Sequence, residues 1–107
     1  MLLTIDVGNT NIKFGIYDKL ELHRIIKIST DSHKTADEIA VELYTLFQVY
    51  SVDPFSIDGC IICSVVPPLT EIFRTAVQKL TGHRALVVGA GIKTGLNILI
   101  EDPASLG

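Results

Sequence analysis

The chain has 107 residues, of which 48% are hydrophobic and 20% charged, and its formal net charge is −3. This length suits one domain with one core, and the apolar fraction excludes a disordered chain. The slight acidic excess argues against a nucleic-acid-binding domain, which normally carries a basic stripe. Two cysteines cannot build a disulfide framework, so we expect a reduced, cytoplasmic compartment. Apolar runs fall far short of the roughly 20 residues that a membrane span needs, and we expect no membrane association.

The first thirty residues predict three antiparallel strands joined by tight turns. Residues 2–7 are almost wholly apolar, as in a strand that is buried on both faces. Alternating apolar residues over 12–17 predict a second strand, which must form a hairpin with the first because a parallel crossover needs far more chain. A turn at Asp18-Lys19 then leads to a third strand over 20–29. One face of this third strand is predicted to carry Leu22, Arg24, Ile26 and Ile28.

Two amphipathic helices alternate with strands in the rest of the chain. Thr35 and Glu38 form a capping box, and apolar residues then recur at steps of three and four. These residues are Ala36, Ile39, Ala40, Leu43, Leu46, Phe47 and Tyr50. The second helix starts at Pro67-Pro68 and ends at Gly82, a residue type that commonly caps helices. Its apolar face is predicted to hold Leu69, Ile72, Phe73, Ala76, Val77 and Leu80.

The remaining strands complete the order βββαβαβ. Short apolar runs predict strands over 59–66 and 85–88, followed by a glycine-rich loop over 89–95 and a strand-like segment over 96–100. A hairpin meander followed by βα units indicates an α/β fold, a mixed sheet with helices packed on it. The ribonuclease H-like fold has this order, as do the two halves of the actin, sugar-kinase and heat-shock-chaperone superfamily. We therefore expect a single ribonuclease H-like domain over 1–107, similar to an actin-like ATPase half-domain, although a fold alone does not decide function.

The turn between the first two strands has the composition of a phosphate site. Asp6 ends a buried strand, and Gly8 and three small polar residues follow. A glycine lets the backbone approach a ligand closely, and successive backbone N–H groups bind anions. Asp6 can hold Mg²⁺ directly or through water, and Lys13 can neutralise a phosphate, as phosphoryl transfer requires.

The same turn also has a purely structural interpretation. Turns rich in asparagine and glycine occur in many hairpins for backbone reasons alone. Asp6 favours the functional interpretation, because an acidic residue in an apolar strand is costly unless it is paired or binds a cation.

Four segments resemble, in order, the motifs of type III pantothenate kinases. The first is Asp6-Val7-Gly8-Asn9-Thr10-Asn11, with Lys13 two residues further on, which resembles the family's phosphate-binding motif. The other three are Cys63-Ser64-Val65-Val66-Pro67, Gly91-Ile92-Lys93-Thr94-Gly95-Leu96 and Asp102-Pro103-Ala104-Ser105-Leu106-Gly107. The first motif alone belongs to the whole superfamily, but the four together span the chain and are specific.

The resemblance implies a reaction and a set of site residues. The implied reaction is the ATP-dependent phosphorylation of pantothenate to 4′-phosphopantothenate, the first step toward coenzyme A. The resemblance also implies a cytoplasmic homodimer that uses Mg²⁺ and a monovalent cation, K⁺ or NH₄⁺. Gly107 is expected to bind pantothenate, and Asp6 to organise Mg²⁺. The family's catalytic base is an aspartate expected just after Gly107, so we expect no catalytic residue within 1–107 and no activity from this piece alone. The residues expected to bind ATP are Asp6, Val7, Gly8, Asn9, Thr10, Asn11, Ile12 and Lys13.

Two other functions remain open at this point. One is a non-catalytic or regulatory module of the actin-like fold. The other is a ribonuclease H-like nuclease, which needs carboxylates converging on two metals, with Asp58 and Glu38 as further candidates; the negative net charge weighs against it.

Several other signals are expected to carry no function. Cys60 and Cys63 have C-x-x-C spacing, but residues three apart on a strand point to opposite faces, so we predict buried thiols and no zinc. The loop over 89–95 misses the spacing of a dinucleotide-binding fingerprint by one residue and precedes a strand-like segment. The three histidines, His23, His33 and His83, are expected at the surface or on strands.

Overall fold

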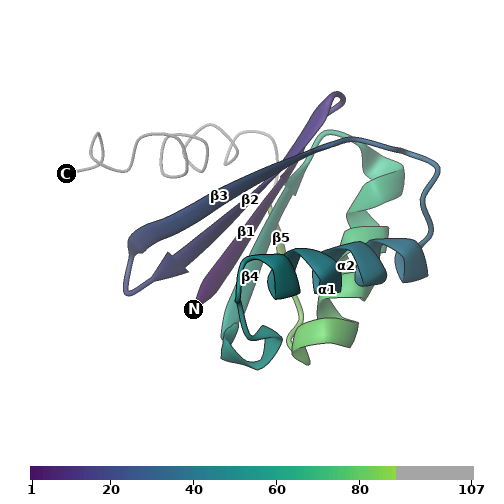
Figure 1. The fold of residues 1–107 in the computed structure, drawn as a ribbon. Coiled ribbons are helices and arrows are strands. Elements are labelled where there is room, and N and C mark those ends of the chain that lie inside the picture. The colour runs from purple at the N-terminus through teal and green to yellow at the C-terminus, as the bar shows by residue number, and fades with distance from the viewer. Residues whose placement is uncertain (89–107) are drawn as a thin grey trace.

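The computed structural model describes residues 1–88, which form a five-stranded mixed sheet with two helices on one side (Figure 1). The elements are β1 (Leu2–Val7), β2 (Asn11–Asp18), β3 (Glu21–Ser29), α1 (Ala36–Val49), the short 3-10 helix η1 (Pro54–Ser56), β4 (Gly59–Ser64), α2 (Pro67–Thr81) and β5 (Leu86–Val88). This order confirms the predicted α/β fold. The expected loop over 89–95, the strand-like segment over 96–100 and Gly107 lie outside the described residues.

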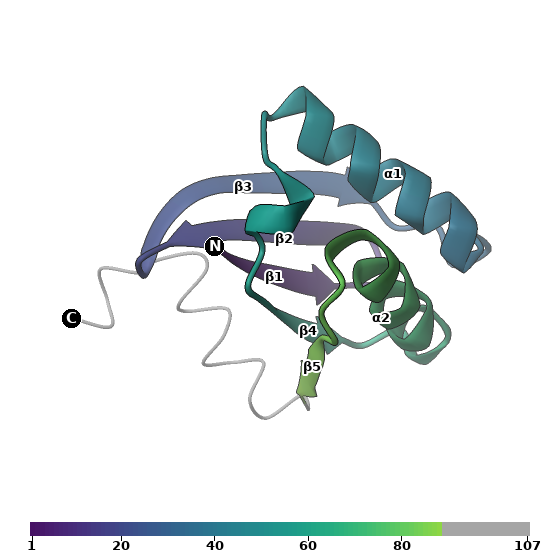
Figure 2. The same ribbon diagram turned by 90° about the horizontal axis from the view of Figure 1, so that it is seen from below.

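The strand order across the sheet is β3-β2-β1-β4-β5, which places β1 at the centre. β1 pairs with β2 in antiparallel fashion and with β4 in parallel fashion. Figure 2 shows α1 on the β3 side of the sheet and α2 on the β4 side. The carboxyl ends of β1 and β4 therefore meet at one edge, since Val7 lies beside Ser64.

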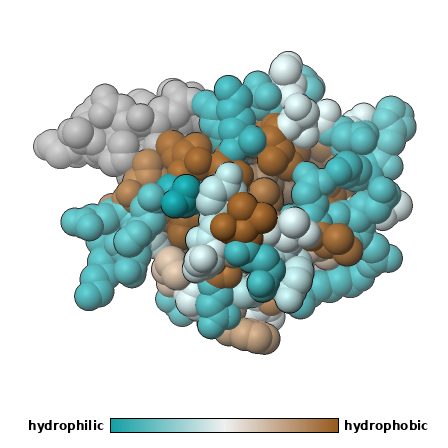
Figure 3. All heavy atoms as spheres, in the orientation of Figure 1, coloured by the Kyte–Doolittle hydropathy of each residue, from teal (hydrophilic) through white to brown (hydrophobic). Residues whose placement is uncertain are grey.

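The main core lies between the sheet and the two helices. Alternate residues of β1 point into it, and Leu3, Ile5 and Val7 are fully buried. The rings of Phe14 on β2 and Phe73 on α2 meet there, with centroids 6.1 Å apart. A buried side chain of this size contributes roughly 1.5–3 kcal/mol relative to an exposed one. On the outer surface, hydrophobic residues lie in several groups among hydrophilic ones (Figure 3), as is usual for a folded domain.

Both helices begin and end as their sequences predict. In α1, Thr35 and Glu38 form the expected capping box, with reciprocal hydrogen bonds of 3.0 and 3.2 Å. Gly82 caps α2 with φ of 77°, a left-handed conformation that favours glycine. The predicted apolar faces are largely confirmed, but Tyr50 at the end of α1 is only partly covered, with the Arg24 guanidinium 4.7 Å from its ring centroid.

The third strand departs from the predicted alternation. A register shift opposite Ile16 and Tyr17 places one extra residue in β3, so that Arg24 pairs with Ile16 but Leu22 pairs with Tyr17. Leu22 therefore packs with Tyr17 and Cys63 on the face of the sheet away from the helices, whereas Ile26 packs in the main core. The prediction that Leu22 shares a face with Ile26 was wrong, because a bulge inverts the alternation beyond it.

The fourth strand ends two residues earlier than predicted. The Ser64 hydroxyl accepts a hydrogen bond from the Val66 N–H and donates one to the Val66 carbonyl, both at 3.1 Å. This local turn redirects the chain from β4 into α2. Within residues 1–88, no helix is long and apolar enough to cross a membrane.

The two cysteines lie on opposite faces of β4, as predicted. Cys60 belongs to the main core, and Cys63 packs with Tyr17 on the other face. Neither cysteine forms a disulfide, and both side chains are buried. Burial raises the pKa of Cys60 to about 12 from an ordinary value of 9.0, because the thiolate would lose its hydration.

This raised pKa predicts a loss of stability in alkali. As the pH rises above 9, the unfolded chain ionises at Cys60 while the folded chain stays neutral up to about pH 12. The free energy of unfolding should then fall by up to about 1.4 kcal/mol per pH unit from this group. In urea denaturation between pH 8 and 10.5, the free energy of unfolding should fall less steeply with pH in Cys60→Ala than in the parent protein. Parallel declines in the two proteins would contradict the assignment.

The turn between β2 and β3 predicts a stabilising substitution. Asp18 pairs with Glu21, which leaves Lys19 and Leu20 as a two-residue loop, one residue later than the predicted turn at Asp18-Lys19. Both loop residues have positive φ, 52° at Lys19 and 68° at Leu20. Leu20 is 86% exposed, so its side chain contributes little packing to offset this strain. Leu20→Gly should raise the free energy of unfolding by about 1 kcal/mol, measured by chemical denaturation. Leu20→Ala, which also has a Cβ, should change it little, and an equal gain from alanine would refute the backbone explanation.

Candidate functional site

The hairpin turn between β1 and β2 lies at the edge of the sheet where β1 and β4 end. The Val65 N–H donates to the Val7 carbonyl at 3.0 Å, which joins the β4–α2 connection to the start of the turn. Open α/β sheets bind ligands beyond the carboxyl ends of their strands. The segment Cys63–Pro67 and the motif that begins at Asp6, distant in sequence, are thus neighbours in space.

The turn is closed by its own backbone and by a residue from the third strand. The Gly8 N–H donates to the Asn11 carbonyl at 2.9 Å. Thr30, which follows β3, donates its N–H to the Thr10 carbonyl at 2.9 Å and its hydroxyl to the Gly8 carbonyl at 2.7 Å. Asn9 and Thr10 are exposed at the tip. The Gly8 N–H, which the sequence suggested for a bound anion, therefore serves the turn itself.

Gly8 is needed because the turn folds closely on itself. A Cβ added at Gly8 would lie 3.0 Å from the Asn11 carbonyl oxygen, closer than nearly all real contacts. Its φ is not in the left-handed region, since Gly82 is the one glycine within 1–88 with positive φ. The expected reason for this glycine was the approach of a ligand, and the structure adds an internal steric reason.

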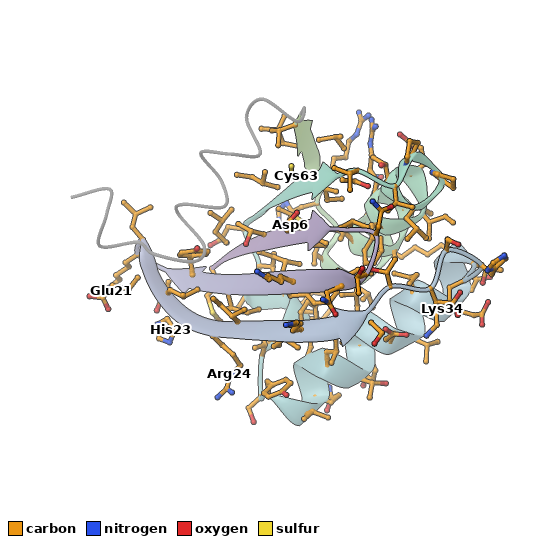
Figure 4. All side chains as sticks on the ribbon, turned by 90° about the horizontal axis from the view of Figure 1, so that it is seen from above. Asp6, Glu21, His23, Arg24, Lys34 and Cys63 are labelled. Atoms are coloured by element: carbon orange, nitrogen blue, oxygen red, sulfur yellow. The ribbon has the colours of Figure 1, made fainter. Side chains whose placement is uncertain are left out.

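Asp6 and Lys13 lie directly opposite each other on β1 and β2. Alternation places both on the face of the sheet away from the helices, where Asp6 lies beside Cys63 of β4 (Figure 4). Asp6 is 9% exposed, its Oδ1 is buried, and Lys13 is half-buried. Cross-strand neighbours approach within about 5 Å at their Cβ atoms, so opposite charges here attract. A buried carboxylate oxygen at a strand end is a donor that suits Mg²⁺.

The other residues of the motif divide into backbone and side-chain contributors. Val7 and Ile12 are buried in the main core at 0% and 1% exposure, so only their backbone can reach a ligand. Asn11 is half-buried where β2 begins. Of the eight residues expected to bind ATP, five have side chains outside the main core: Asp6, Asn9, Thr10, Asn11 and Lys13.

The start of α2, although nearby, is poorly equipped to bind an anion. Its first two residues, Pro67 and Pro68, have no N–H. The Leu69 N–H donates to the Val66 carbonyl at 2.9 Å, and the Val66 N–H is taken by Ser64. Phosphate binding at this edge would therefore depend on the hairpin turn rather than on a helix N-terminus, unlike the sites of Gly-rich strand-to-helix loops. No pattern in the sequence predicted this role of Ser64.

The carboxylates considered for a nuclease do not converge. Asp58 binds the Met1 α-amine at 2.8 Å at the opposite end of β1, and this hydrogen bond lowers the pKa of Asp58. Glu38 caps α1. Within residues 1–88, no group of three or more histidine, cysteine, aspartate or glutamate residues could hold a metal ion. The described part of the chain thus lacks the carboxylate cluster of a two-metal nuclease.

The histidines are surface residues, as predicted. His23 lies 3.7 Å from the Asp18 carboxylate, and His33 lies 3.7 Å from the Asp31 carboxylate; both side chains are exposed. His83 is exposed after the end of α2.

Comparison with known proteins identifies the family. The family model of type III pantothenate kinases matches residues 2–107. The chain belongs to the type III pantothenate kinase family. A type III pantothenate kinase from Roseiflexus sp. (strain RS-1) is 47% identical over 107 residues, covering 100% of this chain and 42% of that protein. Another from Listeria welshimeri is 41% identical, covering 100% of this chain and 41% of that protein.

The chain thus spans about two fifths of the length of these pantothenate kinases. Among solved structures, a ROK hexokinase from Thermus thermophilus superposes with a TM-score of 0.63 at 15% identity, over 91% of this chain and 36% of that one. T. thermophilus RuvC in complex with a Holliday junction substrate gives a TM-score of 0.54 at 13% identity, over 89% and 68%. At these identities the structures support the ribonuclease H-like fold of the chain and say nothing about its function.

The close packing of the turn predicts different effects of alanine on stability at two glycines. Gly8→Ala should lower the free energy of unfolding by about 1 kcal/mol, because the Asn11 carbonyl must move away from the new Cβ. Gly59→Ala is the matched control, since its Cβ would meet only the Leu2 side chain at an ordinary 3.6 Å. Gly59→Ala should be neutral or slightly stabilising in the same urea titration. Equal effects at the two positions would show that the turn tolerates a Cβ.

Proposed function

We propose that this chain forms the ATP-phosphate-binding half of an enzyme that phosphorylates pantothenate. The reaction transfers the γ-phosphoryl group of ATP to the pantothenate hydroxyl and gives 4′-phosphopantothenate, the first step toward coenzyme A. The observation that carries the proposal is the placement of Asp6 and Lys13 opposite each other beside the hairpin turn, in a chain of this family. The non-catalytic and nuclease alternatives have no comparable support.

The site residues have distinct roles in this proposal. Asp6 would hold Mg²⁺, directly or through a water molecule, and the bound ion would supply positive charge for the phosphates. The backbone and side chains of Asn9, Thr10 and Asn11 bind the phosphates, and Lys13 adds a positive charge on the same face as Asp6. Positioning and charge neutralisation provide most of the catalysis in phosphoryl transfer. In the complete enzyme, these residues can therefore contribute much of the rate enhancement although none of them acts as the catalytic base.

The rest of the reaction is assigned by family resemblance. Gly107 contacts pantothenate, and an aspartate just beyond it accepts the proton of the attacking hydroxyl. We further propose a monovalent cation requirement, K⁺ or NH₄⁺, a homodimer and a cytoplasmic location. Activity in K⁺ compared with Na⁺, and the mass of the protein in solution, test the cation and the dimer separately.

Loss of the Asp6 charge should abolish most turnover. In the full-length enzyme, Asp6→Asn keeps the side-chain volume but removes the charge that organises Mg²⁺, so we expect kcat to fall on the order of 100-fold or more. The Mg²⁺ concentration needed for half-maximal activity should also rise. ADP formation with pantothenate and ATP measures both quantities, and circular dichroism checks the fold.

Asp37→Asn is the matched control for this experiment. Asp37 is an exposed carboxylate whose partner is Lys79, 2.8 Å away on α2, and it lies on the helical side of the sheet. Its loss should leave kcat and the Mg²⁺ dependence unchanged. Near-normal turnover in a folded Asp6→Asn enzyme would refute the role of Asp6. ADP formation by the parent enzyme that does not depend on pantothenate would refute the proposed reaction.

A further inference from the structure

Thr30 holds the turn at two points from outside the motif. It follows β3, about twenty positions after the turn in sequence, and Figure 1 shows the end of β3 beside the β1–β2 connection. Its hydroxyl donates to the Gly8 carbonyl at 2.7 Å, and its N–H donates to the Thr10 carbonyl at 2.9 Å. Two alternate carbonyls of the turn therefore point toward the same residue.

These two hydrogen bonds also determine where the next N–H groups point. In a planar trans peptide the C=O and the following N–H point in opposite directions. Fixing the Gly8 carbonyl toward Thr30 directs the Asn9 N–H away from Thr30. Fixing the Thr10 carbonyl directs the Asn11 N–H back into the hairpin, on the same side as the Asn11 carbonyl that accepts from Gly8. Thr30 thus aligns one outward donor of the turn, the Asn9 N–H. Preorganised donors bind and stabilise charge better than donors that must reorient.

The two contacts differ in their dependence on the side chain. Any residue except proline at position 30 can supply the N–H bond to Thr10. The bond to Gly8 needs a hydroxyl on a short side chain, which only serine or threonine provides. The orientation of the Gly8–Asn9 peptide is therefore sensitive to the identity of residue 30.

We propose that Thr30 is a positioning residue of the phosphate site, whose hydroxyl aims the Asn9 N–H at the ATP phosphates through the Gly8 carbonyl. This role rests on the proposed function, since it assumes that the turn binds phosphate. Thr30 acts through the turn and need not contact the nucleotide itself.

The test compares Thr30→Val with Thr30→Ser in the full-length enzyme. Valine keeps the shape of threonine without the hydroxyl, and serine keeps the hydroxyl. We expect Thr30→Val to raise the KM for ATP about tenfold and to lower kcat, with the KM for pantothenate unchanged. Thr30→Ser should restore values near those of the parent enzyme. A residue with a merely structural role would not separate the two substrates in this way.

Thr45→Val is the matched control variant. The Thr45 hydroxyl donates to the Val41 carbonyl at 2.9 Å on the exposed surface of α1. Thr45→Val therefore removes the same kind of hydrogen bond at a position outside the turn. It should leave both KM values unchanged. Circular dichroism and thermal unfolding verify that all variants fold, and the serine variant keeps the test decisive should valine unfold the protein.

A second measurement separates this proposal from the proposed function. Calorimetry measures the affinity of each protein for Mg²⁺ with a non-hydrolysable ATP analogue, and for adenosine, in the absence of pantothenate. Weaker analogue binding in Thr30→Val with unchanged adenosine binding supports the role of Thr30, even if the parent protein fails to phosphorylate pantothenate. An active parent enzyme with unchanged ATP parameters in a folded Thr30→Val overturns the role of Thr30 alone. A parent protein that binds no analogue and phosphorylates no pantothenate overturns both proposals.

Discussion

The position of β1 at the centre of the sheet is the constraint on which the other features depend. Hydrogen bonding to β2 on one side and β4 on the other satisfies its backbone, and its side chains alternate between two packed faces. The residues that point toward the helices are fully apolar, so the few polar residues of the strand must lie on the other face. Asp6 is thereby held at a strand end with little freedom to move. A carboxylate held in this way needs little reorganisation before it binds a cation.

The edge at which β1 and β4 end gathers segments that are far apart in sequence. The β1–β2 turn, the Ser64–Val66 connection and Thr30 meet there through short hydrogen bonds. Each of these bonds uses a group that would otherwise be left without a partner at the end of a strand or helix. The result is a rigid rim whose exposed tip, Asn9 and Thr10, belongs to the hairpin.

This rim differs physically from a site built on a helix N-terminus. The two prolines remove N–H groups from the first turn of α2, and the next N–H groups are already bonded. The helix dipole still directs partial positive charge toward the edge, but few donors accompany it. If this edge binds phosphate, as we propose, the stabilisation must come from the hairpin backbone, Lys13 and Asp6.

Local patterns in the sequence determined most of the secondary structure and the family. The capping box at Thr35, the helical periodicity of α1 and α2, and the αL cap at Gly82 depend on neighbours within a few residues, so they are visible without a fold. Each of the four motifs that resemble type III pantothenate kinases, the one from Asp6 to Lys13 included, is continuous in sequence, which is why the family could be predicted. Only the tertiary structure decided which face carries Leu22, because a bulge depends on how two strands pair. It alone brought Thr30 to Gly8, since hydrogen bonds between distant segments follow from strand register and leave no local trace in the sequence.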